Sequence, residues 1–150
     1  MRGLLSENVI VDRVMTAQAA GATLINTDGV LLGPGDSVLF AISWGTLTVA
    51  PTVHLEQSTD DAAYSDIEAS EIATIDAADD DKVTLLDVRR PGRVGSDEDE
   101  YVRVAIDRTG GNAVVDSVVA YIYDTKEQPV TQSADVAGHK QLNAPVEGTK

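Results

Sequence analysis

The sequence predicts an all-β antiparallel fold, and three observations lead to that prediction. Large apolar side chains recur at every second position in residues 37–44 and 101–107, the period of two expected of half-buried strands. Clusters of Gly, Asn, Asp and Pro separate such stretches and are typical of turns. Residues 1–26 contain neither helix caps nor a long apolar stripe of period 3.6.

Length and composition predict one soluble domain. The chain has 150 residues, of which 43% are hydrophobic and 4% aromatic, so we expect a single, mainly aliphatic core. It has no cysteine, which excludes disulfides, thiolate metal sites and cysteine nucleophiles. We see no secretory signal and no apolar run of the roughly 20 residues that a membrane span needs.

The charge is strongly acidic. A net charge of −14, from 25 acidic and 11 basic residues, makes binding to nucleic acid or to an anionic membrane improbable. Only four of the basic residues are lysines, and this skew resembles proteins from salt-rich surroundings. An ordinary acidic protein is an equally good interpretation.

The first half of the chain is expected to hold several strands. Residues 1–20 are interpreted as an amino-terminal arm with a first strand at 8–15, and residues 21–124 as the folded domain. In residues 37–44 we place the even-numbered side chains in the core, and we expect Gly45 to end that strand. In residues 46–57, Val53 and Leu55 are predicted to point inward, with Pro51 at an edge or a bulge.

Two polar features lie beyond these strands. His54 falls on the outward face beside Glu56; a metal or acid–base role and a simple solvated strand histidine are both considered, and the second is favoured. Ser65 and Glu68 have the spacing of a capping box, which predicts a short helical turn through Ile72.

The segment 76–81 is dense in carboxylates. Asp79, Asp80 and Asp81 are weak candidates for a calcium site, but the alternate spacing and glycine of an EF-hand loop are missing. A solvated acidic loop is the favoured interpretation.

Residues 82–89 are predicted to form a strand, and a basic cluster follows. Arg89, Arg90 and Arg93 stand directly before the acidic run 96–100. Such adjacent blocks suit pairing between neighbouring subunits, although two solvated loop ends would give the same pattern.

The stretch 100–124 is predicted to form a β-hairpin around a turn at 109–112. Its second strand is apolar on both faces, so it is either central in the fold or covered by a partner chain. The candidate oligomer or partner contact consists of the side chains assigned to its outer face: Val115, Val119, Tyr121 and Tyr123.

Residues 125–150 have a different composition, with two prolines and no sustained apolar period. We expect this tail to be disordered alone, or to be an extended carboxyl-terminal arm that orders on a partner. No nucleotide-binding glycine loop, G-x-S-x-G or H-E-x-x-H motif is present, so we expect neither an enzyme nor a cofactor.

Part of the sequence resembles small head decoration, or cement, proteins of tailed viruses and bacteriophages. The resemblance rests on VHLEQSTDDAAYSDIEASEI and on YVRVAI followed by a Gly-containing turn and AVV, and it spans roughly residues 38–124. It implies a β-sandwich, jelly-roll or immunoglobulin-like, that decorates and stabilises the capsid exterior by bridging major capsid protein subunits. It further implies a virion protein made in the host cytoplasm, with the major capsid protein and its own copies, as a dimer or trimer, as partners.

Other functions fit the residues as well. An acidic β-sandwich that binds calcium or carbohydrate through the loops at 60–61 and 79–81 is one alternative, and a neck or tail structural role is another.

Overall fold

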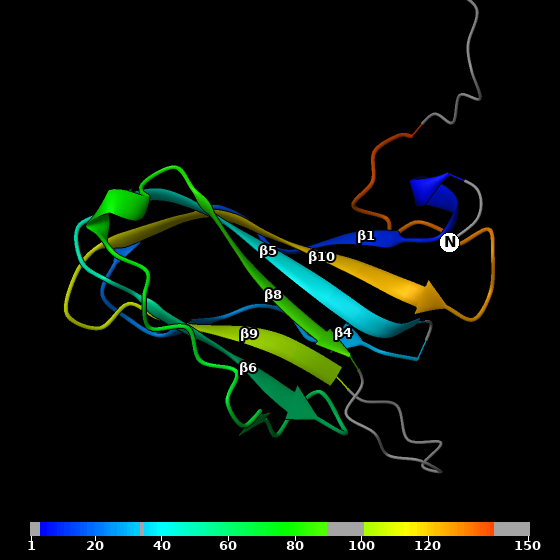
Figure 1. The fold of residues 1–150 in the computed structure, drawn as a ribbon, viewed down its shortest axis with the longest axis horizontal. Helices are drawn as coiled ribbons and strands as arrows, with labels where there is room; N and C mark the ends of the chain where they lie inside the picture. Colours follow the sequence, from blue (N-terminus) through cyan, green and yellow to red (C-terminus); the bar gives the residue numbers. More distant parts are fainter. Residues whose placement is uncertain (1–3, 34, 90–100, 140–150) are drawn as a thin grey trace, which may run out of the picture.

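The computed structural model describes residues 4–33, 35–89 and 101–139, and it is an all-β sandwich of two antiparallel sheets (Figure 1). The strands are β1 Ile10–Met15, β2 Gln18–Gly21, β3 Ile25–Asn26, β4 Val30–Leu31, β5 Gly35–Leu47, β6 Thr52–Ser58, β7 Ser65–Asp66, β8 Val83–Arg89, β9 Tyr101–Asp107 and β10 Ala113–Thr125. The described residues also form two single-turn 3-10 helices, η1 Leu5–Glu7 and η2 Ala77–Asp79. No helix among the described residues is long and apolar enough to span a membrane.

Each sheet has five strands. Sheet A has the order β1-β10-β5-β8, with β2 also paired to β10, and sheet B has the order β3-β9-β6-β7, with β4 also paired to β9. In Figure 1 sheet A lies above sheet B. Strand β10 is central in its sheet, which is one of the two arrangements that its two apolar faces predicted.

The core lies between the two sheets. Within residues 37–44 of β5 the even-numbered side chains are buried, as their alternation predicted: Val38, Phe40, Ile42 and Trp44. They pack in one core with the buried residues of sheet B, which are Val53, Leu55, Val102, Val104 and Ile106. Each buried Val, Leu, Ile or Phe side chain contributes about 1.5–3 kcal/mol when it is fully withdrawn from water. The indole of Trp44 donates a hydrogen bond of 2.8 Å to Thr84, so its polar atom is satisfied within the fold.

The predicted hairpin at 100–124 is wrong, because β9 and β10 belong to different sheets. The turn between them is instead a corner of the sandwich, closed by the buried Arg108. Its guanidinium donates to the carbonyls of Thr23, Ala19 and Ala113 at 2.9–3.1 Å. Gly110 adopts a φ of +98°, which both a hairpin turn and this corner require, so the turn signal alone did not separate them.

Strand β5 does not end at Gly45 but continues to Leu47. Gly45 lies where β5 passes an irregularity of β10, and a Cβ there would come within 2.8 Å of the Val114 side chain. The glycine therefore permits a close approach of two strands rather than ending one.

The predicted helical turn after Ser65 is also absent. Ser65 and Asp66 form β7, and the following segment binds β6: Ile67 N donates to Leu55 O at 2.8 Å, and Ile72 N donates to Val53 O at 2.8 Å. Pairing with a neighbouring strand satisfies the backbone that the capping box would have satisfied locally.

The tail is described as far as residue 139, and this part folds back on the chain's own amino-terminal segment (Figure 1). Gln132 accepts a hydrogen bond from Val11 N at 3.0 Å and donates to the carbonyls of Ser6 and Val9 at 3.0 and 2.7 Å. These bonds cover the free edge of β1, an edge that would otherwise offer unpaired backbone groups to other chains. Of the two expectations for the tail, an extended arm is the one that residues 126–139 resemble, although here the arm contacts its own chain.

Candidate functional site

The outer face of sheet A carries apolar side chains that are exposed or half-buried. Strand register places Leu85, Ala41 and Val119 in one row across β8, β5 and β10, and Asp87, Leu39 and Tyr121 in the next row. We call this surface the sheet A outer face, and its apolar members are Leu39, Ala41, Val83, Leu85, Val119 and Tyr121. Val83 and Leu85, in the first half of the edge strand β8, are each 56% exposed, which is high for large apolar side chains within a sheet.

The predicted contact residues divide between this face and the core. Val119, Tyr121 and Tyr123 lie on the outer face and are half-buried. Val115 is fully buried, so its predicted outward position is wrong. Val115 pairs with Trp44 while Ser117 pairs with Ser43, so Asp116 is an extra residue that reverses the alternation between 115 and 118.

Basic side chains border the same face. Arg89 is exposed in the row of Ser37 and Tyr123, and the exposed Arg13 pairs with Val119. Arg90 and Arg93, the other predicted contact residues, lie outside the described residues. The hydroxyl of Tyr123 donates a 2.7 Å hydrogen bond to Asp87, and this bond together with partial burial raises the pKa of Tyr123.

The acidic segment 76–81 does not converge on a shared point. Asp79 accepts from Lys82 Nζ at 2.8 Å and from Asp76 N at 3.0 Å, which lowers the pKa of Asp79. Asp80 accepts from Leu47 N, and Asp81 adopts a φ of +58°. Asp79 and Asp80 are therefore engaged separately in local structure, and the three aspartates form no shared ligand cluster within the described chain.

The loop at 60–61 is likewise closed by its own bonds. Asp60 accepts from Ala63 N and Ala62 N at 3.0 Å and from Ser58 Oγ at 2.8 Å, and these bonds lower the pKa of Asp60. Asp61 accepts from the hydroxyl of Tyr64. Burial and the bond to Asp61 raise the pKa of Tyr64.

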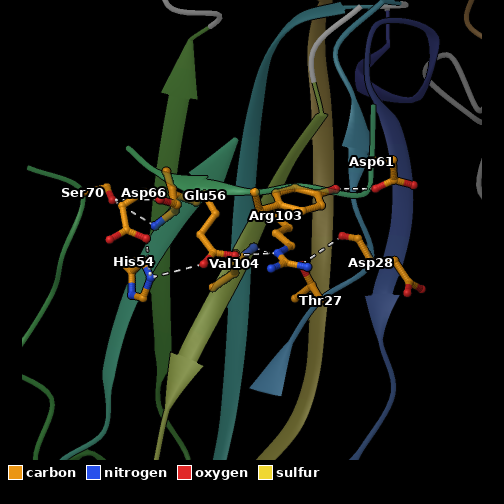
Figure 2. Close-up of polar contacts among 11 residues, drawn as sticks. Thr27, Asp28, His54, Glu56, Asp61, Asp66, Ser70, Arg103 and Val104 are labelled. Atoms are coloured by element: carbon orange, nitrogen blue, oxygen red, sulfur yellow. Dashed lines mark hydrogen bonds and ion pairs between the residues drawn. The ribbon is translucent and has the colours of Figure 1, made fainter. Parts of the chain in front are cut away.

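The outer face of sheet B carries a cluster that the sequence indicated only in part. His54 and Glu56 are alternate residues of β6 and so share a face, and β7 places Asp66 opposite Glu56. His54 Nε2 lies 3.4 Å from Asp66 Oδ1 and 3.8 Å from Glu56 Oε1. We call these three residues the sheet B cluster; Figure 2 shows their side chains pointing toward one another.

Arg103 supports this cluster from the neighbouring strand. Its Nε donates to Glu56 Oε2 at 2.6 Å, and its guanidinium carbon lies 3.7 Å from the centre of the Tyr64 ring. This combination of a charged hydrogen bond and a cation–π contact fixes the carboxylate of Glu56. Figure 2 shows Arg103 reaching Glu56 across the outer face of the sheet.

Within the described ranges, the sheet B cluster is the only group of three potential metal-ligating side chains close enough to share an ion. The sequence predicted that His54 lies beside Glu56, but it did not predict that Asp66 or Arg103 lies near them. Both come from neighbouring strands, so only the strand register brings them to the site.

No protein-family model matches the chain, and a search of curated proteins finds no significant match.

Proposed function

We propose that this chain is a virion structural protein that decorates the exterior of a tailed-virus capsid and bridges major capsid protein subunits, docking through the sheet A outer face. Its support is the sequence resemblance of residues 38–124 and the exposure of that face. The observation that carries the docking surface is the pair Val83 and Leu85, 56% exposed in an edge strand and continuous with Leu39 and Tyr121. A contiguous apolar surface of this kind is typical of a protein contact.

Charge favours another protein as the occupant over a second copy of this chain. Each copy carries a net charge of −14, so face-to-face association of two copies brings two strongly acidic bodies together. The arginines that border the face, Arg13 and Arg89, suit an apolar partner surface with an acidic rim. Repetition over a capsid multiplies a modest contact into strong attachment.

A sheet face, rather than a pocket, suits a bridging role. On sheet B, Arg103 bonds Glu56 and His54 contacts Asp66, whereas the sheet A outer face leaves large apolar side chains exposed, so we assign docking to sheet A. No reaction is needed for this function, and no catalytic role is assigned to any residue.

The direct experiment is quantitative mass spectrometry of purified virions, comparing this chain with the major capsid protein. We expect a copy ratio near one, or a simple fraction of one, because decoration follows capsid symmetry. A handful of copies per virion would replace decoration with a neck or tail role. Absence from the virion would overturn the proposal.

Self-association through the same face is the competing arrangement. Analytical ultracentrifugation of the purified chain distinguishes self-association from capsid docking. If the face docks on the capsid, we expect the purified chain to be a monomer that binds only to capsid protein. A stable dimer or trimer that is lost in Leu85→Glu would show that a second copy is the occupant.

A further inference from the structure

We propose that the sheet B cluster is a binding site for a divalent transition-metal ion of the zinc class, with His54 Nε2, Glu56 Oε1 and a carboxylate oxygen of Asp66 as ligands. This inference is independent of capsid docking, because it concerns the opposite face of the sandwich.

The first support is the spacing of the donor atoms. Zinc bonds nitrogen and oxygen ligands at about 2.0–2.2 Å in a tetrahedron, which sets neighbouring ligand atoms roughly 3.3–3.6 Å apart. The distance from His54 Nε2 to Asp66 Oδ1 is 3.4 Å, and that to Glu56 Oε1 is 3.8 Å. All three donor atoms lie within 4.8 Å of one another. The side chain of Asp66 is 78% exposed, so the protein around it leaves room for its carboxylate to turn toward a bound ion.

The second support is the origin of the ligands. Two come from alternate positions of β6, and the third comes from the strand paired with it, so the sheet backbone fixes all three Cα positions. Ligands on regular strands are held more precisely than ligands on loops. The side chains of His54 and Glu56 are mostly buried, 23% and 14% exposed, which limits their freedom before an ion arrives.

The third support is the contact that orients Glu56. Arg103 holds Glu56 Oε2 at 2.6 Å, which leaves Oε1 facing His54. Arg103 is itself held over the Tyr64 ring. Metal sites generally depend on such outer contacts to orient their ligands, and losing one costs about 10- to 100-fold in affinity.

The ligand types select the class of ion. One imidazole and two carboxylates suit zinc and its first-row neighbours, whereas calcium requires six to eight oxygen ligands. Three protein ligands leave a fourth tetrahedral position for water or for a group from a bound partner. An ion here ties the two-residue strand β7, and the loop that precedes it, to β6.

The test uses the full chain, stripped with a chelator and then titrated with zinc chloride by calorimetry at neutral pH. We expect one ion per chain, a rise in melting temperature on binding, and reversal by the chelator. Calcium chloride at the same concentrations should give neither heat nor a shift.

Variants locate the ion. Asp66→Asn changes an exposed side chain with little risk to folding, and we expect it to weaken zinc binding at least about tenfold, as should His54→Ala. His139→Ala, which removes the other histidine of the chain, is the matched control and should bind as the parent does. No zinc heat for the parent chain, or undiminished binding in Asp66→Asn and His54→Ala, would overturn the proposal and leave the cluster as a polar contact of His54 with its two carboxylates.

Discussion

The outer faces of the two sheets differ in how their side chains are arranged. On sheet B, the side chains of His54, Glu56 and Arg103 are mostly buried and bind one another, so that face is closed by its own contacts. On sheet A, Val83 and Leu85 stand exposed, with half-buried apolar neighbours. The difference indicates that polar side chains on sheet B contact one another within the chain, whereas large apolar side chains on sheet A are left exposed.

The largest expected effect is a difference in stability between a substitution in the core of sheet A and one on its outer face. Val115→Glu places a carboxylate in the core and should lower the free energy of unfolding by at least about 4 kcal/mol. Val119→Glu, four residues along the same strand, faces outward and should leave the fold intact while weakening partner binding. Urea unfolding of both variants measures this. Equal stability of the two would show that the bulge at Asp116 is misplaced.

The next largest effect is the difference in stability lost when one arginine is replaced on each face. Arg103→Met removes the partner of the mostly buried Glu56 carboxylate and should cost about 1.5–3 kcal/mol of unfolding free energy. Arg13→Met on the sheet A outer face replaces an exposed side chain and should change stability by less than about 0.5 kcal/mol. Chemical denaturation gives both values. If the two variants are equally stable, the sheet B face is not held together as described.

Salt should affect the stability of the chain and its docking differently. Repulsion within a chain of net charge −14 is screened over about 10 Å at 0.1 M salt and about 3 Å at 1 M, so the melting temperature should rise with salt. Docking through the apolar sheet A outer face should persist in molar salt, whereas docking carried by charge should weaken. Thermal unfolding and binding, each measured at both salt concentrations, supply the comparison; a flat melting response would count against a surface limited by self-repulsion.

The smallest effects concern pH. The pKa of Asp60 in the folded chain is lowered, chiefly by bonds from the amides of Ala63 and Ala62. Its contribution is therefore present above its ordinary pKa of about 3.9 and lost as the pH falls through the lower folded value. The melting temperature should decrease in this acid range, and Asp60→Asn should flatten part of the decrease. An unchanged acid response in that variant would contradict the assignment.

The pKa of Tyr123, on sheet A, is shifted in the opposite direction to that of Asp60. Its pKa is raised, first by the hydrogen bond to Asp87 and then by partial burial, so its contribution is present below about pH 10 and lost as the pH rises above that value. Tyr123→Phe should make the melting temperature less sensitive to alkaline pH. Tyr64, whose pKa is also raised, should maintain the remaining sensitivity. Thermal melts between pH 9 and 11, measured on the parent and on Tyr123→Phe, check this expectation.

The sequence predicted what depends on local alternation. Inward positions such as Phe40 and Leu55, and the outward position of His54, follow from a period of two within a single strand. The predicted orientation of Val115 was wrong because one extra residue, Asp116, reverses the alternation of inward and outward side chains. The amino-acid composition of the strand gives no sign of this insertion.

Features that depend on pairing between distant segments could not be predicted. The corner at Arg108 uses the same turn residues as a hairpin, and the tail is held by Gln132, a polar residue with no periodic neighbours. Within the sheet B cluster, only the proximity of His54 to Glu56 could be predicted from the sequence. Asp66 and Arg103 required the register of β7 and β9 against β6.

The most direct test of the docking claim is co-sedimentation with capsid particles that lack this chain, using the parent, Leu85→Glu and Leu24→Glu. The two leucines are similarly exposed, 56% and 51%, but Leu24 lies outside the sheet A outer face. We predict that Leu85→Glu loses at least about tenfold in affinity, since a desolvated charge at a contact costs more than 1.4 kcal/mol, while Leu24→Glu binds like the parent. Parent-like binding by Leu85→Glu would contradict the assignment of this face as the docking surface.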